Sequence, residues 1–245
     1  MQGNPVYVNR MLHESDFVIP VCSPGPNGIS GDCLYPEFSN HETIRRFRKK
    51  KDSAKERNAE VRLANASLGI FFTLELVAGP GDKIEEVLCG ESQQTRELSI
   101  DRTNEHWQFH PPADCDMIVA TIETGSGATT WNDVVSAVTS AASITQNDGP
   151  IVVWSNLGEQ PKAKVCEACL SQFEGTISSK LPGQLQHFAA ILAERPVYLK
   201  SRLSHDTIEG LGLGHIESAD EVVRIASGWN SPALLRDGHL RVISR

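Results

Sequence analysis

The chain has 245 residues, of which 40% are hydrophobic and 22% are charged. This composition suits one large α/β domain, or one domain with part of another, and argues against a largely disordered chain. The net charge of −8 argues against a nucleic-acid-binding protein, and no apolar run approaches the roughly 20 residues of a membrane span. The N-terminus shows no secretory signal, so we expect a cytoplasmic protein with reduced thiols.

The first part of the chain begins with an apolar run and a breaker-rich loop. Residues 16–22 predict a buried strand, and residues 23–32, with two prolines and three glycines, predict an irregular loop after it. Open α/β sheets commonly bind ligands at such a loop. Asn40 is a good N-cap for a helix that carries the basic run from Arg45 to Lys51. We interpret this run as a solvated helix end, which the helix dipole favours, in preference to a phosphate site.

A hairpin is predicted next. Residues 50–65 are charged and predict a helix or a surface connection, and residues 67–76 predict a strand. A turn at residues 78–82 leads to a second strand at residues 83–89, and residues 91–102 predict a helix. A proline-rich joint at residues 111–114 then marks a domain boundary.

After residue 116, apolar strands alternate with amphipathic helices. Strands are predicted at 117–122, 151–154, 197–199 and 240–243, and helices at 131–144, 162–173, 184–194, 204–211 and 218–227. This alternation is typical of βαβ units, so we expect an α/β fold with a mostly parallel sheet and helices on both of its faces.

Several short segments, in order along the chain, carry a family resemblance. They include Asn4 to Arg10, Ser15 to Ile19, Pro36 followed by Glu42-Thr43-Ile44, and Val197 to Ser201. In order and spacing the chain resembles nickel-pincer-dependent lactate racemases. The resemblance implies a remnant of the N-terminal domain at residues 1–110 and a C-terminal α/β domain at residues 111–245.

The resemblance also implies a cofactor and a reaction. In this family a lysine tethers a nickel pincer nucleotide, a histidine completes the coordination of the metal, and two further histidines act as bases. The chemistry implied is an isomerase reaction, in which hydride leaves C2 of a 2-hydroxy acid and returns to the other face.

The chain departs from the family at each of these positions. No lysine lies in the loop from Gly28 to Pro36, and Ser23-Pro24-Gly25-Pro26 lacks the histidine of the family's Pro-His pair. Arg48 stands where the nickel histidine would be, and a permanent cation repels a metal ion. Asp133 and Ser136 replace a glutamine and a lysine, and the family's N-terminal portion has no counterpart, so we expect a longer chain or a second subunit.

These departures lead to two hypotheses about function. The first is a diverged racemase-type protein that binds or acts on a small 2-hydroxy acid or related anion, without the nickel pincer and without lactate racemisation. The second is a non-catalytic α/β ligand-binding or interaction protein that retains the scaffold, because a fold alone does not fix a function.

The predicted ligand site lies between a strand and a helix. Backbone amides at a helix N-terminus suit a phosphate or a carboxylate, although a plain βα turn has the same pattern. The site residues that we predict, with two from the earlier glycine loop, are Gly125, Ser126, Gly127, Thr129, Thr130, Asp133, Ser30 and Asp32.

Three other patterns have simpler interpretations. Cys166 and Cys169 could form a redox pair or half a zinc site, but two small core residues are favoured. His41 with Cys22 and Cys33 could form a soft-metal site, but an exposed histidine is favoured. For the aromatic segment from His106 to His110 we favour packing over a place in an interdomain cleft.

Overall fold

The computed structural model of the chain describes residues 7–25, 34–49, 54–111, 115–125, 127–145 and 148–243. The chain forms two compact units, residues 1–79 with 83–106 and residues 80–82 with 107–245. We call them unit 1 and unit 2 and describe each by itself. No helix in these described ranges is both long and apolar enough to cross a membrane.

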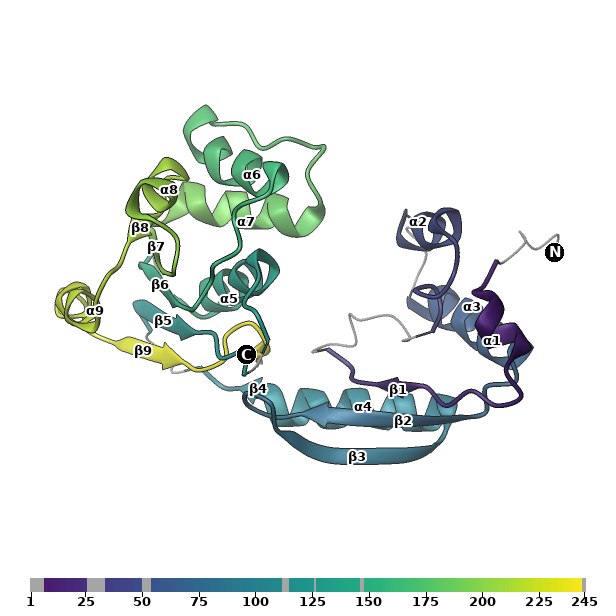
Figure 1. Cartoon of the computed structure of the whole chain (residues 1–245). Helices are drawn as coiled ribbons and strands as arrows, with labels where there is room; N and C mark the ends of the chain where they lie inside the picture. Colours follow the sequence, from purple (N-terminus) through teal and green to yellow (C-terminus); the bar gives the residue numbers. More distant parts are fainter. Residues whose placement is uncertain are drawn as a thin grey trace. The chain divides into compact units, whose positions relative to one another are not determined.

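Unit 1 contains a three-stranded sheet and four helices within its described residues. The sheet has the order β1-β2-β3, with β1 parallel to β2 and β2 antiparallel to β3. Helix α4 lies along one face of this sheet (Figure 1), where Arg96 of α4 contacts Glu75 of β2. The elements are α1 (Arg10–Glu14), β1 (Val21–Cys22), α2 (His41–Lys49), α3 (Ala54–Ser67), β2 (Phe72–Ala78), β3 (Ile84–Glu91) and α4 (Ser92–Trp107).

The start of α2 agrees with the prediction from the sequence. The side-chain oxygen of Asn40 accepts a hydrogen bond from the Thr43 amide at 2.9 Å, which is the N-cap geometry. The predicted hairpin and its turn are also present as β2 and β3.

Two predicted strands of unit 1 were wrong in extent. The run at residues 16–22 forms only the two-residue β1, because β2 pairs with it only at Leu74 and Glu75. The run at residues 67–76 begins as the end of α3. There the Ile70 amide bonds to the carbonyl of Asn65, and Gly69 turns the chain with a φ of 67°.

Unit 2 is an α/β domain with a five-stranded, entirely parallel sheet of order β8-β7-β6-β5-β9. The predicted fold class is therefore confirmed. Its strands are β5 (Met117–Thr121), β6 (Ile151–Trp154), β7 (Val197–Lys200), β8 (Gly214–His215) and β9 (Pro232–Leu235). Its helices are α5 (Trp131–Ile144), α6 (Ala163–Glu174), α7 (Gly183–Glu194), α8 (His205–Gly210) and α9 (Ala219–Ala226).

Apolar side chains cover both faces of the unit 2 sheet. On one face, strand residues such as Ile118 and Val153 pack with buried residues of α5, α6, α7 and α8. On the other face, Met117 and Val152 pack against α9 through Val222, Ile225 and Ala226. Strands buried on both faces are near-continuously apolar, which explains the runs seen in the sequence.

A second, short strand pair lies in unit 2, and it explains the aromatic segment. Strand β4 (Gln108–Phe109) runs parallel to β10 (Val242–Ile243). The strand predicted at residues 240–243 is therefore present only as the two residues of β10. Trp107 is buried under the guanidinium of Arg241, which lies 5.2 Å from the ring centroid. Phe109 packs against the main core of unit 2. Both aromatic rings thus serve packing.

Candidate functional site

The topology of unit 2 marks one place on its sheet where ligands commonly bind. From β5 the chain steps through β6, β7 and β8 in one direction and then returns to add β9 on the other side of β5. The connections therefore diverge between β5 and β9, and open parallel sheets bind ligands at the carboxyl ends of such strands. The described segments at these ends are residues 121–125, 127–133 and 236–239, and we call them the β5/β9 edge.

The end of β9 is joined to the end of β5 by polar contacts. The buried carboxylate of Asp237 accepts a hydrogen bond from the Glu123 amide at 3.2 Å, and the Asp237 amide donates to the Thr121 hydroxyl at 3.3 Å. Asp237 has a φ of 52°, which is uncommon for a residue other than glycine but is tolerated by aspartate. This turn brings the side chains that follow β9 to the start of α5.

His239 adds an imidazole to the same edge. Burial lowers the pKa of His239, and the carboxylates of Asp133 and Asp237 oppose that shift without overcoming it. Its buried Nδ1 has no hydrogen-bond partner among the residues that the structure describes. His239 is therefore a neutral imidazole near pH 7, close to two carboxylates.

The start of α5 is already occupied by carboxylates of the chain itself. Asp133 accepts hydrogen bonds from the amide and the hydroxyl of Thr130 at 2.8 and 2.9 Å. Glu159 accepts one from the Trp131 amide at 3.0 Å. A salt bridge from Lys162, at 2.7 Å, and the Trp131 amide together lower the pKa of Glu159. A helix N-terminus that already holds two anions offers less to an anionic ligand.

The described residues of the predicted ligand site lie in one segment at this edge. Gly127 accepts a hydrogen bond from the Thr124 hydroxyl, and that hydroxyl lies 3.2 Å from the hydroxyl of Thr129. Gly125 has a φ of 53°, and Thr130 precedes α5 directly. The predicted site residues Ser30, Asp32 and Ser126 lie outside the described residues.

Sequence reasoning missed Glu159, Asp237 and His239. The first follows β6, and the other two follow β9, a strand that the sequence did not predict. A signal for Asp237 was present in Arg236-Asp237-Gly238, since Asp-Gly is a common turn dipeptide.

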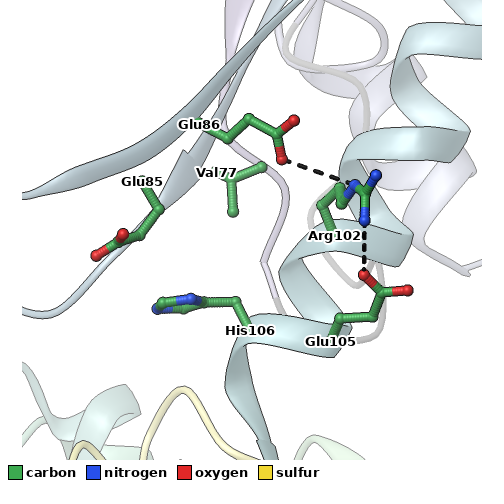
Figure 2. Close-up of a pocket in the computed structure, with 6 residues that line it drawn as sticks. All are labelled: Val77, Glu85, Glu86, Arg102, Glu105 and His106. Carbon is green, nitrogen blue, oxygen red and sulfur yellow. Dashed lines mark hydrogen bonds and ion pairs between the residues drawn. The ribbon is translucent and has the colours of Figure 1, made fainter.

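Unit 1 contains an open depression of about 400 Å³ beside the end of α4. Figure 2 shows Arg102 between Glu86 of β3 and Glu105 of its own helix, at 3.7 and 3.0 Å, with Glu85, His106 and Val77 around the space. The side chains of Arg102, Glu86 and Glu105 are all well exposed to water, so their ion pairs contribute little to stability. The depression has no buried polar group among its lining residues and suits water better than a specific ligand.

The cysteines do not assemble a metal centre in the described part of the chain. No cluster of three or more His, Cys, Asp or Glu side chains suited to a metal occurs there. Cys169 is buried in the core, which raises its pKa to about 12, and Cys166 packs against that core. Cys22 is disulfide-bonded, so it is not a thiolate ligand beside His41, and the prediction of reduced thiols was wrong for this residue.

The residues that the predicted resemblance would place at a nickel site do not suit a nickel pincer. In α2, Phe47 packs edge-on against Tyr35 with ring centroids 5.5 Å apart, and Arg46 contacts Glu60 at 3.2 Å. Arg48 follows at the position where the predicted resemblance would put the nickel histidine, and a guanidinium is not a metal ligand. The glycine loop of residues 28–36 contains no lysine to which the nucleotide could attach.

Comparisons with solved structures identify the fold. No protein-family model matches the sequence, and no curated protein sequence matches it. Lactate racemase apoprotein from Thermoanaerobacterium thermosaccharolyticum matches 98% of this chain with a TM-score of 0.72 and 14% identity. The chain has a lactate-racemase-like fold. A structural-genomics target from Thermotoga maritima matches 98% of the chain with a TM-score of 0.60 and 15% identity.

The match covers nearly all of this chain but only part of each solved structure. The chain covers 66% of the racemase, just under two thirds of it, and 70% of the Thermotoga maritima protein. At these identities the likeness shows the fold alone, and activity must be argued from the residues.

Proposed function

We propose that this chain is a diverged lactate-racemase-like protein that binds a small 2-hydroxy acid or related anion at the β5/β9 edge, without a nickel pincer. The observation that carries the proposal is that Arg236 and His239, whose buried Nδ1 has no hydrogen-bond partner among the described residues, follow β9 where the connections of a parallel sheet diverge.

The side chains at this edge suit the two functional groups of a hydroxy acid. A carboxylate such as Asp133, or the neutral imidazole of His239, can accept a hydrogen bond from the ligand hydroxyl. Arg236 can bind the ligand carboxylate, because its contact with Glu123 is long, at 3.5 Å, and exposed. We place the carboxylate at Arg236 and not on the first turn of α5, where Glu159 and Asp133 already lie.

Racemisation of lactate by a nickel pincer is not part of this proposal. The chain has no lysine in the loop of residues 28–36, and Arg48 stands at the position of the nickel histidine. The family's nucleotide is attached through the side-chain amine of a lysine. Asp32, in the same loop, has a carboxylate and no amine. This loss favours the second candidate, a ligand-binding or interaction protein without turnover, over an isomerase. A cytoplasmic location rests on the sequence alone and stays a prediction.

Calorimetric titration with glycolate, D-lactate, L-lactate and malate tests the proposal. We expect the unaltered chain to bind at least one of them, and Arg236→Gln to weaken that binding about tenfold, as loss of a charged hydrogen bond costs ~1.4 kcal/mol or more. Arg224→Gln, which alters an exposed arginine of α9, is the matched control. Absence of binding to all four acids would refute the proposal.

The absence of lactate racemisation is tested separately from ligand binding. Polarimetric assay of D- and L-lactate interconversion, after incubation with the nickel pincer nucleotide, is expected to give only background. Interconversion above background would show that the chain is a lactate racemase after all.

A further inference from the structure

The turn that follows β9 is held by hydrogen bonds to β5 and within itself. The Gly238 amide donates a hydrogen bond to the Thr121 carbonyl at 3.0 Å. The Arg241 guanidinium donates one to the Arg236 carbonyl at 2.8 Å, which closes the turn on itself. His239 lies between these bonds, so its backbone is fixed on both sides.

The same turn lies directly on α5. A Cβ added at Gly238 would lie 3.2 Å from the Cβ of Ala120 on β5 and 3.6 Å from the Cβ of Ala137 on α5. Asp133 precedes Ala137 by four residues, which places the two on one face of the helix. The close approach of Gly238 to α5 therefore brings the neighbouring His239 to the carboxylate of Asp133, and that carboxylate acts on the imidazole.

The charged side chains around His239 come from α5, from the end of β5 and from the turn itself, and they are Asp133, Glu123, Arg236, Asp237 and Arg241. Glu123 and Arg236 pair with each other at 3.5 Å. The carboxylates of Asp133 and Asp237 act on the imidazole, and both favour its protonated form.

Burial decides the charge of His239 in the free chain. Burial lowers the pKa of His239 more than the two carboxylates raise it, so the imidazole is neutral near pH 7. Its Nδ1 is buried without a hydrogen-bond partner among the residues that the structure describes, whereas Nε2 is not shut off from water in this way. A ligand can therefore meet the ring at Nε2. An anion there acts in the same direction as the two carboxylates.

We infer that the anion binds at the β5/β9 edge together with a proton, which His239 takes up from the solvent. The imidazolium then donates a hydrogen bond from Nε2 to the ligand carboxylate, beside the guanidinium of Arg236. An imidazolium has no acceptor, so the ligand hydroxyl donates to Asp133. The two bonds from Thr130 to Asp133 both use Oδ2, and Oδ1 can accept from the hydroxyl. Proton uptake rests on the proposed function, because it needs the anion at this edge.

Proton uptake couples the affinity for the ligand to pH. Since the bound anion raises the pKa of His239, the gain in affinity is fully present below the pKa of the free chain. It is lost as the pH rises through the pKa of the complex. Between these two pKa values the affinity should fall by up to about tenfold per pH unit. By the same linkage, the ligand raises the pKa by as much as the proton strengthens binding.

Calorimetric titration of the full chain at pH 7, in HEPES and in Tris, tests the inference with glycolate, D-lactate, L-lactate and malate. The two buffers differ in ionisation enthalpy, so a proton taken up on binding changes the observed heat between them. We expect uptake of about one proton per ligand, and weaker binding at pH 8 than at pH 6. His239→Gln should abolish the uptake, and His187→Gln, at an exposed histidine of α7, should retain it.

The outcomes separate this inference from the proposed function. Binding with the same heat in both buffers, or uptake that persists in His239→Gln, would overturn proton uptake by His239 and leave the proposed function standing. Absence of binding to all four acids between pH 6 and pH 8 would refute both. If His239→Gln does not fold or bind, an NMR titration of the imidazole in the unaltered chain decides. The pKa of His239 should be higher with ligand than without, and an unchanged pKa would overturn the inference.

Discussion

Unit 2 and unit 1 differ in which side chains lie between their sheets and helices. Both hydrophobic clusters found among the described residues lie in unit 2, where apolar side chains fill both sides of a parallel sheet. In unit 1, the buried side of the sheet holds an ion pair between Glu75 and Arg96, whereas several apolar side chains of the other side are exposed. The difference teaches that two units of one chain can bury opposite kinds of side chain between sheet and helix, apolar clusters in unit 2 and an ion pair in unit 1.

The largest expected effect comes from a cavity in the core of unit 2. Phe188 is fully buried on α7, and Phe188→Ala should lower the free energy of unfolding by ~3–5 kcal/mol. Phe173→Ala makes the same change on α6 at a ring that is 70% exposed, and it should cost much less. Chemical denaturation monitors both variants, and equal losses would show that the assignment of the core is wrong.

The next effect comes from the polar interior of unit 1. Arg96→Met removes the cation beside the buried Glu75 carboxylate and should cost ~3 kcal/mol, because taking one partner out of a buried ion pair is expensive. The double variant Glu75→Leu with Arg96→Met removes both charges and should recover most of that loss.

An exposed ion pair on the same helix supplies the control for this prediction. Arg102→Met breaks contacts with Glu86 and Glu105 at the surface, and it should change stability by less than ~1 kcal/mol. If Arg96→Met is as mild as Arg102→Met in urea unfolding, the Glu75 pair is not buried in solution.

A smaller effect should appear in the pH titration of Glu159. Its pKa lies below the ordinary 4.5, chiefly because of Lys162 and then because of the Trp131 amide. A depressed carboxylate pKa stabilises the fold above the unfolded pKa, and that contribution is lost as the pH falls through the folded pKa. In an NMR titration Lys162→Met should raise the pKa of Glu159, whereas Lys164→Met should leave it unchanged.

The smallest perturbation is chemical labelling of the cysteines. Exposed Cys89 should react with iodoacetamide in the native protein at pH 8, whereas Cys169, with a pKa of about 12, should be protected until unfolding. Peptide mass spectrometry reads the two sites separately. Rapid labelling of Cys169 in the folded chain would revive the redox interpretation of the Cys166 and Cys169 pair.

The sequence predicted unit 2 better than unit 1 for a physical reason. Helix 131–144 and strand 151–154 were predicted with the observed bounds, because amphipathic and continuous apolar patterns there follow from burial on one or both sides. In unit 1 the apolar run 70–72 mixes a buried Ile70 with Phe71 and Phe72, which are 72% and 41% exposed, so the run did not mark where α3 ends and β2 begins. Strand prediction from apolar runs assumes that apolar residues are buried, and it fails where they are exposed.

Of the candidate site, the sequence predicted the segment between β5 and α5 but not the residues that follow β9. The segment around Thr130 and Asp133 was identified because it follows an apolar strand and begins a helix. Asp237 and His239 reach the same edge through β9, whose sequence Pro-Ala-Leu-Leu gives little strand signal. Which strand lies beside β5 is decided by the crossover that follows α9, and a single sequence does not contain that pairing.

The central claim is most directly tested by amide chemical shifts in ¹⁵N-labelled protein titrated with the four hydroxy acids. Our account expects saturable shifts centred on residues 121–133 and 236–239 of unit 2, with those of Asp133 and His239 among the largest. Shifts confined to other parts of the chain, or none at millimolar concentrations of all four acids, would contradict it.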